Sequence, residues 1–274
     1  MSVSESSAAA AYFLAIDTST EVLSLALGAA ALSASARDAS PPLWQYTGAG
    51  GSHSSATLIP ETMRLLAQAG LRLQDVQALV VGIGPGSFTG LRTACAVAQG
   101  LALGAGTPVL PISTLLAVAE DWRERQAVQQ AQGRVWALLD ARMDEIYAAC
   151  WQWRSDAAQL AHAAVQWQCV QAPVLVAPED LLALPGWQAE DAWAGNVQAV
   201  YGQRLPRPVK TVIGAAMPTA AALLRLAPAL WQQGAAVDAA LLLPHYVRDK
   251  VAQTTAERAA EKAAAQAAAA QAQS

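Results

Sequence analysis

The feature of this sequence best suited to chemistry is a glycine-rich turn at residues 84–92, which read Gly-Pro-Gly-Ser-Phe-Thr-Gly-Leu-Arg. The apolar run at 78–81 before it is typical of a buried strand, and Ser87 can cap a helix that starts at Phe88. Such a turn points backbone N–H groups at one place, which suits an anion. The Walker A lysine and the dinucleotide glycine spacing are both missing. The turn is either a modified phosphate cradle or a tight connection that positions the helix, and the second interpretation is favoured.

Two aspartates that follow expected strands are the other residues able to hold a nucleotide or its metal. Asp17 follows an apolar run at 12–16, and Asp140 follows a similar run at 135–139. A phosphate-binding hairpin needs glycines so that its backbone can approach the phosphates, yet the next residues read Thr-Ser-Thr and Ala-Arg-Met. These carboxylates could hold a hydrated Mg²⁺, but the capping of turns is the favoured interpretation.

The residue pattern gives little support to metal or nucleophile chemistry. The histidines His53, His162 and His245 are far apart, and none has a second histidine four residues away. Ser87 does not lie in a Gly-x-Ser-x-Gly elbow. Cys95 falls on the apolar face of an expected helix, which indicates buried packing. We therefore expect no metal site and no catalytic triad, and we expect His53 to begin a helix.

The composition favours a folded protein with a large core and disfavours several functional classes. Of the 274 residues, 54% are hydrophobic and 14% are charged, which suits one large domain or two small ones. The formal net charge is −4 and the basic residues are scattered, which disfavours direct binding of nucleic acid. Three cysteines without a Cys-x-x-Cys pair suit a reducing cytoplasm. No segment reads as a signal peptide or a membrane span.

The first 110 residues read in the order β-β-β-α-β-α-β, which is typical of a mixed sheet covered by helices. Pro60 should kink the first helix or mark its true start, and Gly70 should end it. Strands are expected at 12–16 and 21–27 as a hairpin, then at 32–37, 78–81 and 107–110; helices are expected at 54–69 and 88–103, and a loop at 41–51.

The second of these helices carries a row of small residues. Gly90, Ala94 and Ala98 lie on one line at a spacing of four, which lets another helix approach closely. Packing against the sheet of the same chain and contact with another subunit are both open. If the row is a subunit contact, Ala94→Glu or Ala98→Glu should abolish pairing and leave the monomer folded.

The second half of the chain reads as another domain that opens with a hairpin. Six of the nine tryptophans lie between residues 136 and 193, and most should serve packing. A helix at 115–124 and a polar stretch at 126–133 lead into strands at 135–139 and 145–153; a short helix at 178–184, a strand end at 193–195, a helix at 218–233 and ordered chain at 241–248 follow. From residue 252 the chain is a helix-prone alanine and glutamine tail.

Six landmarks give the chain a resemblance to a known family. They are Ala-Ile-Asp-Thr-Ser at 15–19, His-Ser at 53–54, the glycine turn at 84–92, Asp-Ala-Arg-Met-Asp-Glu-Ile-Tyr at 140–147, Gly-Asn at 195–196 and Pro-His-Tyr-Val-Arg at 244–248. In this order, across residues 12–250, they resemble the bacterial TsaB (YeaZ) family. The glycine turn and the segment at 140–147 are the specific landmarks.

The resemblance implies an α/β protein with the actin-like, Hsp70-like ATPase fold (ribonuclease-H-like), in which two related mixed-sheet domains flank a degenerate nucleotide site. The double glycine that usually admits adenosine is reduced here to Gly195-Asn196. The expected segments are a flexible lead at 1–11, an N-terminal actin-like domain with the partner-binding helices at 12–112, a second actin-like domain at 113–216, a C-terminal helix and segment packing back at 217–250, and a tail at 251–274.

The resemblance also implies a function. The protein would be a non-catalytic cytoplasmic subunit, without a cofactor or metal, that binds and activates a TsaD-type catalytic subunit for threonylcarbamoyl transfer to adenosine 37 of tRNAs reading ANN codons. A TsaE-like ATPase would be a further partner, the chain alone would form a homodimer, and tRNA would be contacted only through the complex. An ATP-hydrolysing or phosphotransferase member of the fold and a metallopeptidase-like protein are the alternatives. The histidine pair of the TsaD family is missing, since residues 112–116 read Ile-Ser-Thr-Leu-Leu.

The resemblance further implies two sets of site residues. The family's partner contact uses two helices of the N-terminal domain, which correspond here to 54–69 and 88–103. The expected contact residues are Leu58, Thr62, Leu65, Leu66, Gly90, Leu91, Ala94, Ala98 and Leu101. A vestigial nucleotide or phosphate loop is expected at Asp17, Thr18, Ser19, Gly84, Pro85, Gly86 and Asp140. No catalytic residue and no metal ligand is expected.

Overall fold

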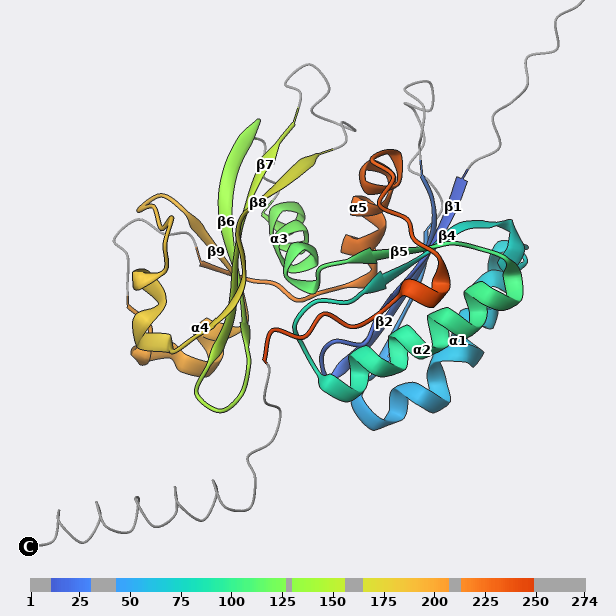
Figure 1. Cartoon of the computed structure of the whole chain (residues 1–274), viewed down its shortest axis with the longest axis horizontal. Coiled ribbons are helices and arrows are strands. Elements are labelled where there is room, and N and C mark those ends of the chain that lie inside the picture. Colours follow the sequence, from blue (N-terminus) through green and yellow to red (C-terminus); the bar gives the residue numbers. More distant parts are fainter. Residues whose placement is uncertain (1–10, 31–42, 127–129, 156–164, 207–212, 249–274) are drawn as a thin grey trace, which may run out of the picture.

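The computed structural model describes residues 11–30, 43–126, 130–155, 165–206 and 213–248, and these form two sheets with helices around them (Figure 1). The first sheet has the strand order β3-β2-β1-β4-β5. Its first three strands pair antiparallel, whereas β4 and β5 run parallel to β1. Its strands are β1 (Ala11–Asp17), β2 (Val22–Ala30), β3 (Leu43–Ala49), β4 (Val76–Gly82) and β5 (Val109–Ile112).

The second sheet repeats the topology of the first. Its order is β10-β9-β6-β7-β8, so the first strand of each half again lies between an antiparallel hairpin and two parallel strands. Its strands are β6 (Gln132–Asp140), β7 (Ile146–Arg154), β8 (Gln166–Val176), β9 (Ala192–Gly195) and β10 (Ile213–Ala215). The chain is therefore built from two halves with the same strand arrangement.

Helices cover both faces of the first sheet because side chains along its strands alternate between two cores. Leu14 and Ile16 of β1 face α1 (Ser54–Ala69) and α2 (Phe88–Ala105), which lie on the outer face in Figure 1. Phe13 and Ala15 face the opposite core, which contains α5 (Ala220–Gln232). Shorter helices are α4 (Val197–Tyr201) and the 3₁₀ turns at Gly51–His53, Leu73–Asp75, Pro178–Ala183, Gly202–Arg204 and Ala239–Leu241.

The helix α3 (Thr114–Arg125) joins the two halves. It follows β5 directly and packs against β6, β9 and α5, so it lies between the two sheets (Figure 1). The helix α5 then returns the chain to β1 and β2. The domain division after residue 112 stays a prediction.

Most expected elements are confirmed, but the loop expected at 41–51 is wrong. Residues 43–49 form β3, the edge strand beside β2. Trp44 and Tyr46 are half-buried and pack on the core under α1 and α2, whereas their neighbours are exposed, which is the period-two pattern of an edge strand. The strand expected at 32–37 lies outside the described residues. The strands β8 and β10 were not expected from the sequence.

Two expectations about the helices also need correction. Pro60 does not mark the start of α1, since the helix begins at Ser54 and continues through it to Gly70, which adopts the left-handed conformation (φ 67°). The small row of α2 faces inward: Gly90, Ala94 and Ala98 are all buried within the chain. The row therefore serves internal packing, and it is not available to another subunit.

Candidate functional site

The loops at the carboxyl ends of the parallel strands bring the expected phosphate-loop residues together. β1 ends at Asp17, β4 at Gly82 and β5 at Ile112, and parallel strands place their carboxyl ends at one sheet edge. In the second sheet, Asp140 ends β6 and Asn196 follows β9 at the corresponding edge, where the Asn196 side chain accepts a hydrogen bond from the Asp140 N–H at 2.8 Å. The two edges face each other across a cleft.

The glycine turn is a tight connection whose backbone bonds within the chain. The Ser87 N–H donates to the Ser19 carbonyl at 2.7 Å, and the Ser87 hydroxyl caps α2 by accepting from the Gly90 N–H at 3.2 Å. Thr18 donates to the Gly90 carbonyl at 2.6 Å. A Cβ at Gly86 would overlap the Ser19 carbonyl, so glycine is needed for this close approach. The favoured interpretation from the sequence, a tight connection, agrees with these bonds.

Asp17 is a turn cap that lies beneath the loop surface. Its Oδ1 accepts from the Ser19 N–H at 3.0 Å and from the Ser19 hydroxyl at 2.7 Å. Its Oδ2 is buried and has no hydrogen-bond partner among the described residues. Burial raises the pKa of Asp17 from 3.8 to about 6, against the opposing effect of the Ser19 hydrogen bonds.

We expect Asp17→Asn to stabilise the protein increasingly as the pH rises from 4 to 7. Because the folded-state pKa of Asp17 is raised, the contribution of this carboxyl to the folding stability of the wild type is fully present below pH 3.8. It is lost as the pH rises through about 6. The gain of the variant over wild type should grow by about 2 kcal/mol across this range. Urea unfolding at several pH values measures it. Asp75→Asn is the control, since Arg72 lowers the pKa of Asp75 and the trend there should reverse; a pH-independent difference for Asp17→Asn would contradict the prediction.

The turn between β6 and β7 holds three consecutive residues in a conformation that L-amino acids disfavour. Arg142, Met143 and Asp144 have φ values of 60°, 54° and 58°. Asp140 supports the turn, since its Oδ1 accepts from the Arg142 N–H at 2.8 Å and from the Tyr201 hydroxyl at 2.7 Å. Asp140 is thus a turn cap, which is the interpretation that the sequence favours.

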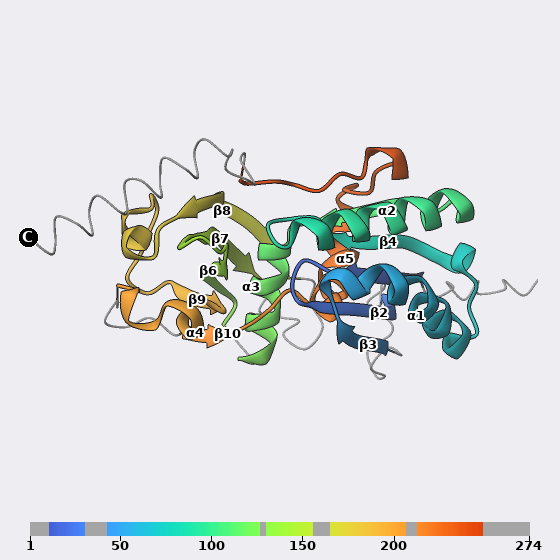
Figure 2. The ribbon, with the colours of Figure 1, turned by 90° about the horizontal axis from the view of Figure 1, so that it is seen from below.

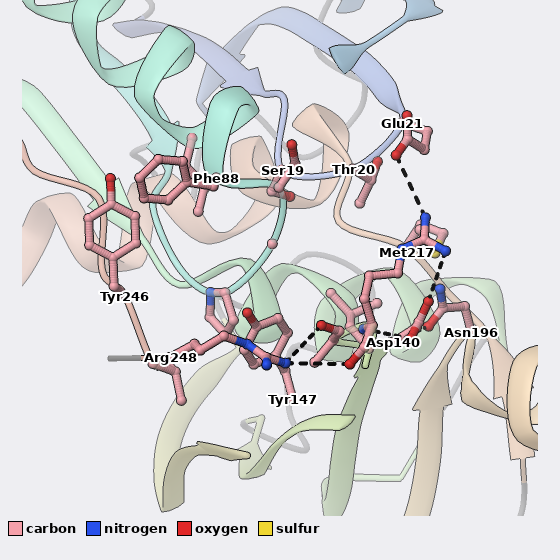
Figure 3. A pocket seen from close by; sticks show the side chains of 18 of the residues that line it. Ser19, Thr20, Glu21, Phe88, Asp140, Tyr147, Asn196, Met217, Tyr246 and Arg248 are labelled. Atoms are coloured by element: carbon pink, nitrogen blue, oxygen red, sulfur yellow. Dashed lines mark hydrogen bonds and ion pairs between the residues drawn. The ribbon is translucent and has the colours of Figure 1, made fainter. Parts of the chain in front are cut away.

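A cavity of about 370 Å³ lies in the cleft between the two sheet edges (Figure 3). Its walls come from both halves, with Ser19 and Phe88 on one side and Asp140 and Asn196 on the other. Of the seven expected phosphate-loop residues, the cavity is lined by Ser19, Pro85, Gly86 and Asp140, whereas Asp17, Thr18 and Gly84 are buried behind it.

The cationic side chains of the cavity already have acidic partners. Arg142 lies 3.3 Å from the Asp140 carboxylate and 3.7 Å from that of Glu21 across the cleft. Arg248 donates to Glu145 at 2.7 Å and to the Ala141 carbonyl at 3.0 Å. Both arginines that line the cavity therefore lie within ion-pair distance of carboxylates of the chain.

A C-terminal segment at residues 239–248, which we call the strap, lies along α2 and lines the cavity with residues 245–248. The His245 N–H donates to the Ile83 carbonyl at 2.7 Å in the glycine turn, and Arg248 reaches the strained turn of the second half. Tyr246 packs beside Phe88, with ring centroids 5.2 Å apart, and its hydroxyl accepts from Arg92 Nε at 2.8 Å. Arg248 and Arg92 were not expected as site residues, although both lie within the landmark segments that carried the resemblance.

The outward side of α1 and α2 is the second candidate site. Eight of the nine expected contact residues are buried inside the chain, and Leu101 is partly buried, so these residues cannot themselves form a partner surface. The exposed side instead carries uncharged residues, which we call the outer helical face: Ala56, Ile59, Met63 and Ala67 of α1, with Ala96, Gly100, Leu103 and Gly104 of α2. The expectation of two partner-binding helices stays a prediction, but its residues shift to this face.

Three further residues that the sequence singled out are His53, Cys95 and His162. His53 immediately precedes α1 and is exposed. Cys95 is buried, and burial raises its pKa to about 11. His162 lies outside the described residues. Within the described ranges, no group of three or more His, Cys, Asp or Glu side chains could hold a metal ion, and no helix is long and apolar enough to cross a membrane.

The family comparison covers most of the chain. The family model described as "TsaD: tRNA N6-adenosine threonylcarbamoyltransferase" matches residues 49–273. The tRNA threonylcarbamoyladenosine biosynthesis protein TsaB of Haemophilus influenzae is 35% identical over 242 residues, which are 87% of this chain and 94% of that protein. The protein of the same name from Escherichia coli is 38% identical over 147 residues, 51% of this chain and 54% of that protein.

Solved structures show the same relationship. YeaZ from Pseudomonas aeruginosa matches with a TM-score of 0.68 and 34% identity, over 86% of this chain and 99% of that one. A second structure, of an uncharacterized protein with similarity to peptidase YeaZ from Pseudomonas aeruginosa, matches with a TM-score of 0.69 and 33% identity, over 87% and 100% of the two chains. With the repeated mixed sheets, these matches give the actin-like, ribonuclease-H-like ATPase fold.

Proposed function

The chain belongs to the TsaB (YeaZ) family of tRNA threonylcarbamoyladenosine biosynthesis proteins, and from this premise we propose that it is the non-catalytic subunit that binds and activates a TsaD-type catalytic subunit. Family membership gives its involvement in threonylcarbamoyladenosine biosynthesis. The proposal adds the mechanism: binding of the catalytic partner through the outer helical face, in support of threonylcarbamoyl transfer to adenosine 37 of tRNAs reading ANN codons.

The observation that carries the proposal is a pair of glycines on the outer helical face. Gly100 and Gly104 lie inside α2 at a spacing of four, and each costs about 1 kcal/mol of helix stability relative to alanine. Apart from its chain neighbours and the backbone of its own helix, a Cβ at either position would meet no heavy atom of the described residues within 4 Å, so packing within them does not require glycine there. With Ala96 they form a smooth outward row that permits close approach of a partner helix.

The charged side chains of α1 lie away from the outer helical face. Its Arg64 lies over the Tyr46 ring of β3 and pairs with Glu61, so the charged side of the helix faces the edge strand. Ile59 and Met63 are 44% and 43% exposed on the other side of α1, as the helical period of 3.6 residues places them. Large exposed apolar side chains that gather on adjacent elements are typical of protein interfaces.

The cleft supports the non-catalytic part of the proposal. In the glycine turn the Ser87 N–H and the Gly90 N–H donate within the chain, and the two cavity arginines lie within ion-pair distance of carboxylates. A nucleotide would compete with these contacts for the Ser87 N–H and for the two guanidinium groups. We propose that the cleft is maintained as a structural joint, and that no metal or cofactor is used.

The decisive variant is Gly100→Glu. It adds a charge to the centre of the outer helical face at a position with open space, so the chain should fold normally. Binding to the TsaD-type protein of the same organism, measured by titration calorimetry, should weaken about 100-fold or more. tRNA modification by the mixed proteins should fall in parallel.

Ala199→Glu is the matched control, because it adds the same charge at an exposed position of α4 in the other half. It should leave both binding and modification unchanged. Normal binding by Gly100→Glu would mean that the partner docks elsewhere. ATP hydrolysis or peptide cleavage by the chain alone would instead favour one of the enzyme alternatives.

Three finer assignments belong to the same proposal. The chain alone should form a homodimer through the outer helical face, since an uncovered apolar surface tends to self-associate. A TsaE-like ATPase would join the complex, and tRNA would be reached through the complex. We place the complex in the cytoplasm, which suits three free cysteines.

A further inference from the structure

The strap runs antiparallel along α2 and forms one edge of the outer helical face. Arg92 at one end of the helix bonds to Tyr246, and Gln99, two turns later, donates to the Leu242 carbonyl at 3.0 Å. Leu103 is one further turn along α2, so it lies level with the 3₁₀ turn Ala239–Leu241, which packs against the helix. Figure 2 shows this segment along α2 on the side away from α1.

The strap turns two leucines toward solvent at this place. Leu242 is buried in the core with Ala239, whereas Leu241 and Leu243 are each 68% exposed. Leu242 has extended backbone, which directs consecutive side chains to opposite sides. Leu103 is 67% exposed, and no large hydrophobic side chain of the described residues outside this trio is more exposed.

We propose that Leu103, Leu241 and Leu243 form a second part of the partner surface, contacted by the same TsaD-type subunit that covers α1 and α2. We call these three residues the leucine ledge. This inference rests on the proposed function and adds to it a contact made by the C-terminal segment. The ledge extends the helical interface beyond the two helices.

The leucine ledge is continuous with the outer helical face, which argues that the same TsaD-type subunit covers both. Leu103 belongs to the outer helical face and to the ledge, and it follows Gly100 by three positions on the same side of α2. A partner helix that packs over Gly100 and Gly104 approaches α2 closely, which brings its flanking residues down onto the strap. The burial of these three exposed leucines would stabilise a complex by the apolar area removed from solvent.

The test is the double variant Leu241→Asp/Leu243→Asp, assayed as the full chain with the TsaD-type protein. Both side chains point outward, so the thermal unfolding midpoint should stay at the wild-type value. The dissociation constant for the partner should rise about 10-fold or more. The double serine variant, which removes apolar area without adding charge, should weaken binding in the same direction. Val200→Asp, at a 50% exposed position of α4, is the control and should bind as wild type.

The outcomes separate this inference from the proposed function. Wild-type affinity in both double variants, together with lost binding by Gly100→Glu, would overturn the ledge and leave the helical interface standing. Self-association lost without any change in partner affinity would assign the ledge to a homodimer and also overturn the inference. Absence of binding by the wild-type chain would remove both proposals together.

Discussion

Replacement of Ala98 by glutamate is expected to abolish the folded state of this protein. Ala98 is fully buried in the core between α2 and the first sheet. The longer side chain must be forced into a packed interior, and its carboxylate would be buried without a partner. Together these effects should cost about 4–8 kcal/mol, which reaches the range of a whole domain's stability. Since a whole domain is stabilised by only about 5–15 kcal/mol, we expect loss of the cooperative unfolding transition in guanidinium chloride.

Ala96→Glu is the matched control for this substitution. Ala96 lies two residues away on the same helix and is exposed on the outer helical face. The variant should unfold with the wild-type midpoint but should lose partner binding. A folded Ala98→Glu monomer that merely fails to pair is the result expected from the sequence alone, and it would contradict the buried placement of this row.

The second large effect is expected for Glu120→Ala. Glu120 is 2% exposed and accepts hydrogen bonds from Arg123 of α3, Arg225 of α5 and Trp167 of β8, at 3.0 to 3.2 Å. Its removal leaves two partly buried guanidinium groups without their carboxylate. Loss of one member of such a network should cost about 3–5 kcal/mol, measured by urea unfolding. Because the three elements meet between the sheets, this joint holds the two halves together.

Two further variants separate charge from shape at this position. Glu120→Gln keeps the volume and acceptor oxygen, so it should lose less stability than the alanine variant. Glu124→Ala removes a 55% exposed carboxylate from the same helix, 3.9 Å from Arg123, and should change stability by about 0.5 kcal/mol or less. Equal losses for Glu120→Ala and Glu124→Ala would show that the buried network is energetically unimportant.

Whether a feature of the site could be predicted from the sequence depends on how far apart in the chain its interacting residues lie. The Ser87 cap, the Gly70 terminus and the capping roles of Asp17 and Asp140 were all predictable, because each involves partners at most four residues away. The strap was not, because Arg92 and Tyr246 are 154 residues apart. No local pattern encodes such a contact.

The sequence by itself determined the helices and inner strands of the first half and the turns that end them, since hydrophobic periodicity and capping act within a few residues. Only the tertiary structure decided which side of α2 faces the core. The helix carries two rows of small residues at a spacing of four. The inward row is Gly90, Ala94 and Ala98, and the outward row is Ala96, Gly100 and Gly104. They differ only in which row packs against the sheet, and that orientation is set by contacts between α2 and strands distant in the chain.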